Sequence, residues 1–351
     1  MKARDIFLAK IKRAHAPRVA IGSATSVVTT DLMKAANASF PAAHLNVEKM
    51  VKLATAAYTV LGFDNVMPLF SVWHESAALG CKVDWGNSGR MPDGRPVFAS
   101  IDEDIRIPKD FLMKPSCAVP LKALALLRKE IGNDVAVVGK VFGPWTLAYH
   151  FFGVQEFLMS TLLQPDSVRR VLRKLIEVTV SFAKAQIEHG ADALTLADHC
   201  TRDLCSPDAY RDFLAAMHQE LHERIHCPLI LHICGDTSDR LKYIRAAGIE
   251  CFHFDSKVPA EDARRLAGEK LALMGGTSNI NVVRNGTPET IAQDIAEKLR
   301  NGIDIIGPEC AVPLDAPCKN LKLIATMAKE LDGQRRRRER IMAALPDSPL
   351  C

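Results

Sequence analysis

Short, almost wholly apolar runs alternate along the chain with longer stretches in which apolar residues recur every three or four positions. The short runs are rich in Val, Ile, Leu and Ala, and they are followed by Gly, Pro, Asp or Ser. This pattern is typical of strands buried on both faces of a parallel sheet. Eight segments fit it: residues 18–22, 65–70, 134–141, 191–198, 228–234, 250–255, 271–276 and 303–307.

The stretches between the runs carry the signals of helices. Ser206 and Thr287 each precede a proline, as expected of a helix N-cap followed by its first turn. Gly248 and Gly302 end helical patterns at positions where glycine commonly terminates a helix. Eight strands separated by helices fit a closed barrel better than an open sheet. The sequence therefore predicts an α/β fold, a (β/α)8 TIM barrel.

No internal repeat, low-complexity linker or break in composition divides the chain. We therefore expect residues 1–351 to form one barrel domain with an N-terminal helical extension. Residues 335–351 are expected to be a charged helix end and a tail, with the arginines at 335–338 on a solvated helix face. Residues 84–107 are rich in turn formers and charges, which predicts a long loop over one face of the barrel. That loop is a candidate lid or docking element.

Composition limits the classes of function. Of the 351 residues, 48% are hydrophobic and 25% are charged, which is ordinary for a globular protein. A net charge of +4 gives no reason to expect nucleic acid as a partner. The chain has neither the apolar stretch of about 18 residues needed to span a membrane nor a signal peptide. We expect a cytoplasmic protein whose ten cysteines are free thiols, a few of which bind metal.

The segment LHICGD, residues 231–236, indicates where such a metal would bind. Side chains alternate along a strand, so His232 and Cys234 face the same side, with Cα atoms about 6.6 Å apart. One zinc ion can bridge this pair, because its bonds are about 2.0–2.1 Å to nitrogen and about 2.3 Å to sulfur. The strand ends at Gly235, which places both residues at the C-terminal mouth, where barrel active sites form.

Two further residues complete the predicted metal site. Cys310 follows the last strand in GPECAVP and supplies a second sulfur, and Asp255 closes the sixth strand and can supply a weaker oxygen. Three firm ligands with one exchangeable position are typical of a catalytic zinc site. On spacing alone, a packed histidine beside a buried cysteine is the commoner explanation. The metal hypothesis gains from three candidates that lie at the ends of three strands of one barrel.

Several segments resemble a known family. They read AHLNVEKMVKLATAAYTVLGFDNVMPLF (residues 43–70), ALGCKVDWG (78–86), VFGPWTLA (141–148), ADALTLADHCTRDLCSPDAYRDFL (191–214), LHICGDTSDRLKYIRAAGIECFHFDSKV (231–258) and GIDIIGPECAVPLDAPCKNLKLI (302–324). Together they resemble the zinc-dependent branch of the uroporphyrinogen decarboxylase superfamily, which contains the methylcobamide:coenzyme M methyltransferases. The resemblance runs over nearly the whole chain.

The resemblance implies roles for individual residues. His232, Cys234 and Cys310 would be the zinc ligands, and Asp255 would complete the zinc shell until a thiol displaces it. The family residue at that place is usually Glu, which is one methylene longer than Asp255. Asp198, which closes the fourth strand, matches an acidic residue in the family's cavity, so Asp198 and Asp255 are the predicted catalytic residues.

The sequence also departs from the family pattern. Glu309 and Ala311 flank Cys310, where the family usually has glycine on both sides. His199 and Cys200 are unusual after Asp198. These departures bear on the identity of the acceptor thiol more than on the metal.

Other residues near strand ends are candidates for the cavity wall that contacts the cofactor: Glu75, Tyr149 and His150. Each fits a structural role at least as well. Glu75, for example, fits an ion pair with a lysine or arginine on the rim, just as Asp198 fits a cap of the following turn.

By this resemblance the protein is a zinc-dependent methyltransferase. It would move a methyl group from a methyl-corrinoid (methylcobalamin or a protein-bound cobamide) to a small thiol such as coenzyme M or homocysteine, with a corrinoid-binding protein as its partner. The alternatives are another acceptor such as tetrahydrofolate, uroporphyrinogen decarboxylase itself, and a non-catalytic barrel that binds a corrinoid or tetrapyrrole. Against the decarboxylase alternative, this sequence lacks the arginine-rich motif that decarboxylases carry near the first strand, since no arginine follows Arg18 there.

Overall fold

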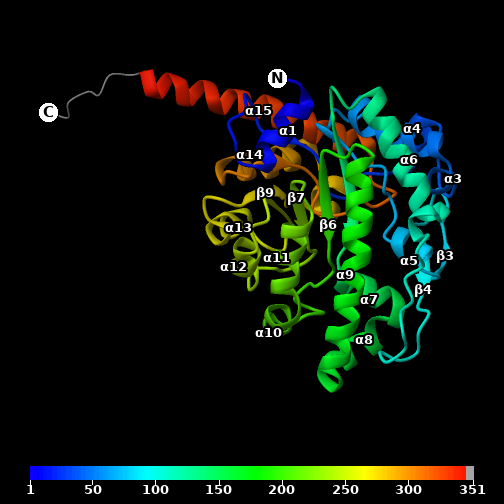
Figure 1. The fold of residues 1–351 in the computed structure, drawn as a ribbon. Helices are drawn as coiled ribbons and strands as arrows, with labels where there is room; N and C mark the ends of the chain where they lie inside the picture. The colour runs from blue at the N-terminus through cyan, green and yellow to red at the C-terminus, as the bar shows by residue number, and fades with distance from the viewer. Residues whose placement is uncertain (345–351) are drawn as a thin grey trace.

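The structure, a computed structural model, describes residues 1–344. Eight short parallel strands form a nearly closed barrel in the order β1-β10-β9-β8-β7-β6-β5-β2 (Figure 1). Each predicted apolar run coincides with one of them, and only β5 extends past its run, by one residue, so the predicted barrel is confirmed. The strands are β1 (Ala20–Ile21), β2 (Asn65–Val66), β5 (Ala136–Phe142), β6 (Ala193–Ala197), β7 (Leu229–His232), β8 (Cys251–Phe254), β9 (Ala272–Gly275) and β10 (Ile305–Ile306).

Helices follow every barrel strand. The predicted caps are present: the Ser206 hydroxyl accepts a hydrogen bond from Ala209 N, and that of Thr287 accepts one from Thr290 N. The α-helices are α1 (Ala3–Ile11), α2 (Thr30–Ala36), α3 (Ala42–Leu45), α4 (Val47–Thr59), α5 (His74–Ala78), α6 (Pro115–Glu130), α7 (Pro144–Phe152), α8 (Val154–Leu163), α9 (Pro165–Glu188), α10 (Pro207–Ala209), α11 (Ala215–Arg224), α12 (Leu241–Ala246), α13 (Ala260–Ala267), α14 (Pro288–Arg300) and α15 (Cys318–Ala344). Shorter turns are the 3₁₀ segment Phe111–Met113 and the π-helical segments Tyr210–Leu214 and Asn279–Arg284.

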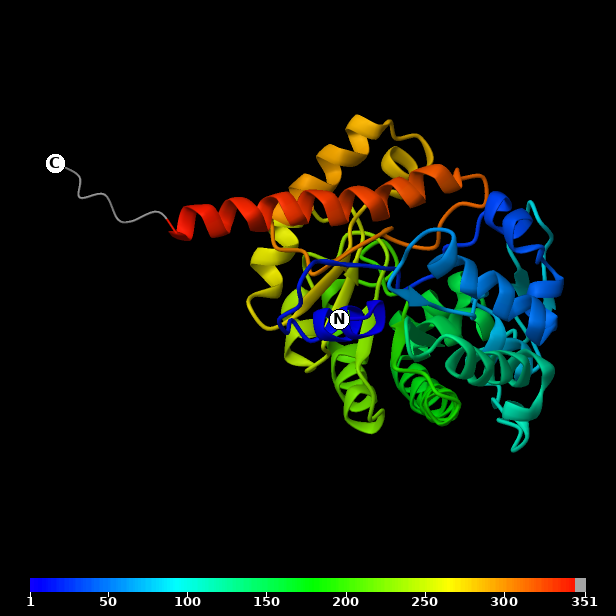
Figure 2. The same ribbon diagram turned by 90° about the horizontal axis from the view of Figure 1, so that it is seen from above.

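The N-terminal helix closes one end of the barrel. Ile6, Phe7 and Ile11 of α1 are buried against the side chains that fill the N-terminal end of the barrel, including Val138 and Ile230. Figure 2 looks onto this end and shows α1 lying across it. Because the N-terminal end is closed in this way, a ligand can enter the barrel only from the C-terminal mouth.

The predicted loop over residues 84–107 contains regular structure. β3 (Lys82–Asp84) and β4 (Asp93–Arg95) pair as an antiparallel hairpin at its start. The turn formers close this hairpin: the Asp84 carboxylate accepts a hydrogen bond from Gly86 N and forms an ion pair with Arg90. Gly94 lies so close to the Trp73 ring that a Cβ there would be 2.6 Å from it. The expectation of an irregular loop is therefore wrong for this part.

The last helix, α15, carries the arginines at 335–338, and its far end extends beyond the barrel (Figure 1). Arg335 pairs with Asp332 and Glu339, and Arg336 also pairs with Asp332. Residues 345–351 of the predicted tail lie outside the described residues. Within residues 1–344, none of the helices combines the length and the apolarity that crossing a membrane requires.

Side chains complete the barrel between β1 and β2, where the strands are too short for a regular ladder. Asp64 N donates to Ile21 O at 2.7 Å, and the Asp64 carboxylate accepts from Ile21 N at 2.9 Å. The Asn65 amide bonds both the N–H and the C=O of Ser23. Arg18 forks onto the two oxygens of Asp64 at 2.6 and 2.7 Å. We call this set, Asp64 and Asn65 with their partners, the barrel seam.

Removing the buried acid of the barrel seam should destabilise the fold. Asp64→Ala leaves Ile21 N without its carboxylate acceptor and Arg18 without its partner, which should lower the free energy of unfolding by roughly 3–5 kcal/mol. Chemical denaturation followed by circular dichroism measures this. The control is Asp134→Ala, because Asp134 pairs with Lys2 at the exposed surface, and its loss should cost at most about 0.5 kcal/mol. Equal effects of the two variants would contradict this account of the seam.

Candidate metal centre

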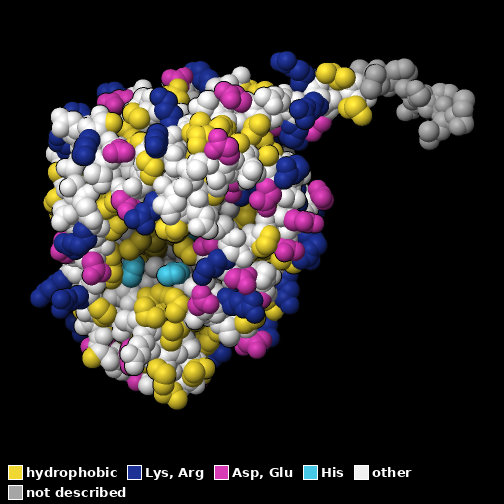
Figure 3. All heavy atoms as spheres, turned by 180° about the vertical axis from the view of Figure 1, so that it is seen from behind, with side chains coloured by type: hydrophobic (Ala, Val, Ile, Leu, Met, Phe, Trp, Pro, Cys, Tyr) yellow, Lys and Arg dark blue, Asp and Glu magenta, His cyan; other side chains and the backbone are white. Residues whose placement is uncertain are grey.

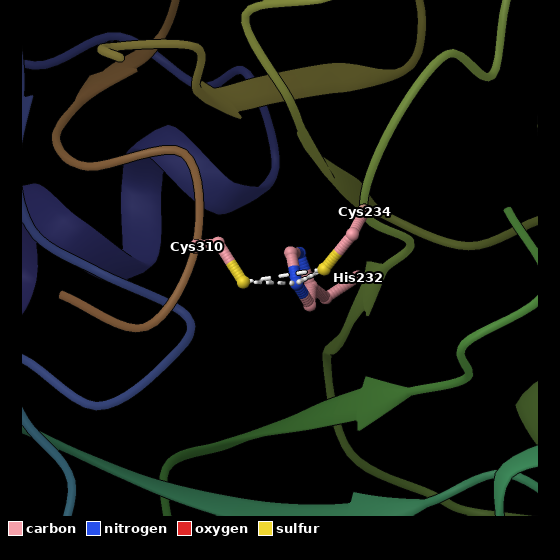
Figure 4. Close-up of side chains that lie close together, drawn as sticks. All are labelled: His232, Cys234 and Cys310. Atoms are coloured by element: carbon pink, nitrogen blue, oxygen red, sulfur yellow. Dashed lines mark hydrogen bonds between the residues drawn. The ribbon is translucent and has the colours of Figure 1, made fainter. Parts of the chain in front are cut away.

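Three predicted ligands meet at the C-terminal mouth of the barrel. His232 is the last residue of β7, Cys234 follows it by two positions, and Cys310 lies in the loop after β10. The His232 Nε2 atom is 3.1 Å from Cys234 Sγ and 3.5 Å from Cys310 Sγ, and the two sulfurs are 3.2 Å apart. Figure 4 shows the three side chains pointing toward one another from the two segments. The structure thus brings together the residues that the sequence places 76 and 78 positions apart.

The spacing of these atoms fits a tetrahedral zinc ion. Bonds of about 2.3 Å to sulfur and about 2.0–2.1 Å to nitrogen separate two sulfurs by about 3.8 Å and sulfur from nitrogen by about 3.6 Å. The observed separations, 3.1 to 3.5 Å, lie within about 0.6 Å of these values. Small side-chain rotations would therefore let His232, Cys234 and Cys310 hold one ion and leave a fourth position open.

A chain of hydrogen bonds fixes the tautomer of His232. His253 Nε2 lies 2.8 Å from the carbonyl oxygen of Pro308, so that nitrogen carries a proton and donates it. Burial holds the pKa of His253 well below its ordinary value, so the ring is neutral and its Nδ1 is an acceptor. His232 Nδ1, 2.8 Å away, must therefore be the donor to it. The Nε2 lone pair of His232 is then left facing the two sulfurs, as a metal ligand requires.

The two thiols at the site share a proton unequally. A hydrogen bond from Cys234 lowers the pKa of Cys310 well below its ordinary value, and the same bond raises the pKa of Cys234. Burial opposes the ionisation of both thiols. In addition, a second thiolate only 3.2 Å from the first would be repelled by it unless a cation lay between them. A divalent ion would remove that penalty and allow both cysteines to bind as thiolates.

Two carboxylates tie the mouth loops together around these ligands. Asp255 accepts hydrogen bonds from Gly235 N at 2.8 Å and Lys257 N at 2.9 Å. Glu309 accepts from Ser256 N at 3.0 Å and from Asn279 N at 2.7 Å. The loops after β7, β8, β9 and β10 are therefore joined into one frame. Glu309, which departs from the family pattern, is turned toward these backbone groups.

The predicted fourth ligand, Asp255, is not among the atoms that lie together. The cluster of ligand atoms consists of His232, Cys234 and Cys310, while both oxygens of Asp255 bind backbone N–H groups. Gly235 next to Cys234 has a φ of +78°, and a Cβ there would lie 2.2 Å from Thr201 Oγ1. The turn His232-Ile233-Cys234-Gly235 thus needs glycine at its last position, because its φ is positive and because a side chain there would collide with Thr201. The role of Asp255 as a zinc ligand stays a prediction.

The cluster opens into a cavity of about 260 Å³ at the barrel mouth. Figure 3 shows this hollow, with histidine side chains inside it and hydrophobic side chains around it. Its lining residues are Thr25, Ser26, Phe70, Val72, Met91, Lys140, Phe142, Thr146, His150, Ala197, Asp198, His199, His232, Cys234, Cys310 and Ala311. The candidate ligands therefore face a space large enough for a small molecule.

Asp198 lines this cavity, as predicted, and is 1% exposed. One of its oxygens accepts from Thr146 N at 2.8 Å and from the Thr146 hydroxyl at 3.0 Å. The other lies 3.0 Å from His218 Nε2, and His218 Nδ1 lies 2.9 Å from the Tyr210 hydroxyl. A Cβ on Gly143 would lie 2.2 Å from the Asp198 carboxyl carbon. The carboxylate is thus held rigidly at the cavity wall.

The other predicted cavity residues are placed differently. His150 lines the cavity, stacks on Trp73 and bonds the Ser76 hydroxyl at 2.8 Å, and burial lowers its pKa to about 3. Tyr149 lines a neighbouring hollow and accepts a hydrogen bond from the Trp145 indole. Glu75 is fully buried behind the wall, where its Oε1 accepts from Phe142 N at 2.9 Å. Neither Tyr149 nor Glu75 lines the cavity itself.

Three residues of the site were not found from the sequence: His253, His218 and Lys140. A signal existed for two of them. His253 lies on β8, two positions before Asp255, which follows the end of that strand, so alternation puts both on one side. Lys140 is a charged residue in the otherwise apolar strand AVVGKVF. His218 lies on α11 and has no such pattern, because its partner Asp198 comes from a different part of the chain.

Comparisons with known proteins agree with this geometry. The sequence profile of the family described as uroporphyrinogen decarboxylase (URO-D) matches residues 2–331. The chain belongs to the uroporphyrinogen decarboxylase family. Within that family it is 35% identical over 303 residues to the methylated-thiol–coenzyme M methyltransferase of Methanosarcina mazei, which covers 86% of this chain and 82% of that protein.

Two further comparisons point to the same branch of the family. The chain is 28% identical to the methylcobamide:CoM methyltransferase MtaA of Methanosarcina barkeri, over 92% of this chain and 96% of that protein. A solved methyltransferase from Methanosarcina mazei superposes with a TM-score of 0.90 at 28% identity, over 94% of this chain and 99% of that one. Fold and sequence thus place the protein with methyltransferases of this family.

The hydrogen-bond chain through His253 should control metal affinity. His253→Leu removes the 2.8 Å acceptor of His232 Nδ1 and leaves only the longer contact of 3.3 Å to the backbone carbonyl of residue 253. The ring of His232 is then held less firmly, which should weaken zinc binding roughly 10-fold. Competition with a chromophoric chelator measures this. The matched control is His44→Leu, because His44 is equally buried but neither ring nitrogen has a hydrogen-bond partner among the described residues. If both variants bind zinc like the parent protein, the tautomer argument is wrong.

Proposed function

We propose that this protein is a zinc-dependent methyltransferase that moves a methyl group from a methyl-corrinoid to a small thiol. The observation that carries the proposal is the convergence of His232 Nε2 with the sulfurs of Cys234 and Cys310 on an open cavity. The names of the similar proteins, which specify coenzyme M as acceptor and a methylcobamide or a methylated thiol as donor, support it.

His232, Cys234 and Cys310 would hold the ion as one neutral imidazole and two thiolates. A bound zinc ion supplies one piece of chemistry, which is to make the substrate thiol a thiolate at neutral pH. The substrate thiolate would take the methyl group from the corrinoid, which would keep the electron pair of the broken cobalt–carbon bond. The protein's part is to orient the sulfur and to keep the tautomer of His232 fixed.

The thiol proton needs an acceptor, and we propose Asp198 for this role. Among the described residues that line the cavity, Asp198 is the one with a carboxylate. Its hydrogen bonds to Thr146 and His218 fix the carboxylate at the wall of the cavity that also borders the candidate metal centre. Asp255 is proposed as the exchangeable fourth ligand, through lone pairs that its bonds to Gly235 and Lys257 leave free. A zinc-loaded structure in which Asp255 keeps its distance from the ion would refute that part.

The size of the cavity supports a protein partner. About 260 Å³ accommodates a small thiol, whereas a corrinoid macrocycle with its side chains is several times larger. We therefore propose that the corrinoid stays outside the barrel, carried by a corrinoid-binding protein that docks over the mouth. Uroporphyrinogen decarboxylation is less well supported, because no arginine is among the described lining residues to meet the substrate's carboxylates.

The reaction can be tested with the Cys310→Ala variant. Zinc-loaded protein mixed with methylcobalamin or a protein-bound methyl-corrinoid and a small thiol should demethylate the corrinoid, which changes its absorption spectrum. Cys310→Ala removes a ligand while leaving the barrel folded, so the rate should fall at least about 100-fold, beyond the loss typical of residues that only support a ligand.

The matched control is Cys318→Ala, because Cys318 is partly buried away from the candidate metal centre and its sulfur is hydrogen-bonded to the Thr29 hydroxyl. That variant should keep the parent rate. A methylated thiol as the donor is tested in parallel. Normal transfer by Cys310→Ala, or decarboxylation of uroporphyrinogen by the parent protein, would overturn the proposed function.

A further inference from the structure

One lysine is buried inside the barrel. Lys140 lies in the middle of β5, between Gly139 and Val141, and is 3% exposed. Its neighbour in register is Thr195 of β6, and its side chain reaches the cavity that also borders His232, Cys234 and Cys310. A cationic side chain therefore faces the same space as the candidate metal centre.

The ammonium group of Lys140 makes no ion pair with a carboxylate of the described chain. Its amino group is described in contact with a ring rather than with a carboxylate, and the hydrogen bond that Lys140 donates to a side chain comes from its backbone N, to Gln186 Oε1. Its close neighbour is the Phe142 ring, whose centroid is 5.4 Å away. A buried charge without a partner is costly, so a charge in this position calls for a partner that binds from outside.

The nearby Glu75 and Cys310 favour the charged form of Lys140 by electrostatic attraction, but neither forms an ion pair or a hydrogen bond with its ammonium group. The Oε1 atom of Glu75 is taken by Phe142 N, and its Oε2 has no partner among the described atoms. Burial raises the pKa of Glu75 to about 7, so much of it is protonated at neutral pH. Burial lowers the pKa of Lys140 to about 8, which leaves most of the lysine charged at that pH. The cavity thus keeps a net positive group on its wall.

The charge of the loaded site explains why such a group is useful. A zinc ion, two cysteinates and a neutral His232 sum to zero, so an added substrate thiolate makes the centre negative. A second negative group on the same substrate would be repelled unless a cation lay nearby. Among the described residues lining the cavity, Lys140 is the only lysine or arginine.

We propose that Lys140 is a specificity-determining residue, which binds an anionic group of the substrate while the substrate sulfur lies at the candidate metal centre. The group would be a sulfonate or a carboxylate, since both accept charge-assisted hydrogen bonds from an ammonium. This inference rests on the proposed function. The rival explanation is that Lys140 has only a structural role in the barrel interior.

The test compares thiols that differ in charge. Calorimetry of the zinc-loaded protein without corrinoid gives the Kd of 2-mercaptoethanesulfonate, 3-mercaptopropionate and neutral 2-mercaptoethanol. Lys140→Met should weaken binding of the anionic thiols roughly 10- to 100-fold, as expected for loss of a charged hydrogen bond. Binding of 2-mercaptoethanol should change less than about threefold, because that thiol makes no such bond. Steady-state kinetics should show the same loss in KM more than in kcat.

Two variants control for the charge itself. Lys140→Arg keeps the positive charge and should retain the preference for anionic thiols. Lys257→Met removes an exposed lysine that lies on the mouth loop after β8, and it should leave all three Kd values unchanged. If Lys140→Met does not fold, Lys140→Gln replaces it. The preference of the parent protein for anionic over neutral thiols is a further test that needs no variant.

Each outcome has a defined meaning. A loss confined to the sulfonate, or shared by the sulfonate and the carboxylate, supports the inference and identifies the group. An equal loss for the neutral thiol, no loss at all, or a parent protein without preference for anionic thiols overturns it. Failure of every thiol to accept a methyl group would instead refute the proposed function, even if the binding preference depends on Lys140.

Discussion

The contact between His253 and His232 is the constraint on which the candidate site depends. It joins two neighbouring strands, β7 and β8, and through the carbonyl of Pro308 it also reaches the loop that carries Cys310. Because a carbonyl can only accept, the position of every proton along this chain is determined. One buried ring therefore aims the nitrogen of His232 and fixes the distance to the loop that supplies a sulfur.

The mouth of the barrel is rigid for a related reason. Asp255 and Glu309 accept hydrogen bonds from backbone groups of neighbouring loops, so the segments that carry the ligands cannot move independently. A candidate metal centre built in this way is preorganised, which would reduce the rearrangement needed when an ion binds. The same arrangement gives Glu309, an unusual neighbour for Cys310, a structural role that its sequence position alone does not reveal.

Sequence patterns predicted the strands and the meeting of the candidate ligands well, because both depend on local order. Apolar runs mark buried strands, and alternation along β7 puts His232 and Cys234 on one side without any knowledge of the partner strands. Cys310 was predictable because each strand of a barrel ends at the same mouth. The caps at Ser206 and Thr287 are likewise set by residues within one turn.

What the sequence could not predict depends on which side chains meet across the fold. The barrel seam needs the register of β1 against β2, and the partnership of Asp198 with His218 needs the packing of α11. Glu75 was expected in the cavity but lies one layer behind it, because its oxygen is used by Phe142 N. The hairpin of β3 and β4 was missed because its strands are too short and too polar to stand out from a loop.

The most direct test of the central claim is X-ray absorption at the zinc edge, with and without a thiol substrate. The account predicts one zinc per chain, bound by two sulfurs and one nitrogen together with a lighter fourth ligand, in the protein without thiol. Addition of the substrate should raise the number of sulfurs from two to three, because the thiol takes the fourth position. A zinc ion whose sulfur count stays at two during active methyl transfer, or active protein that contains no zinc, would contradict the account.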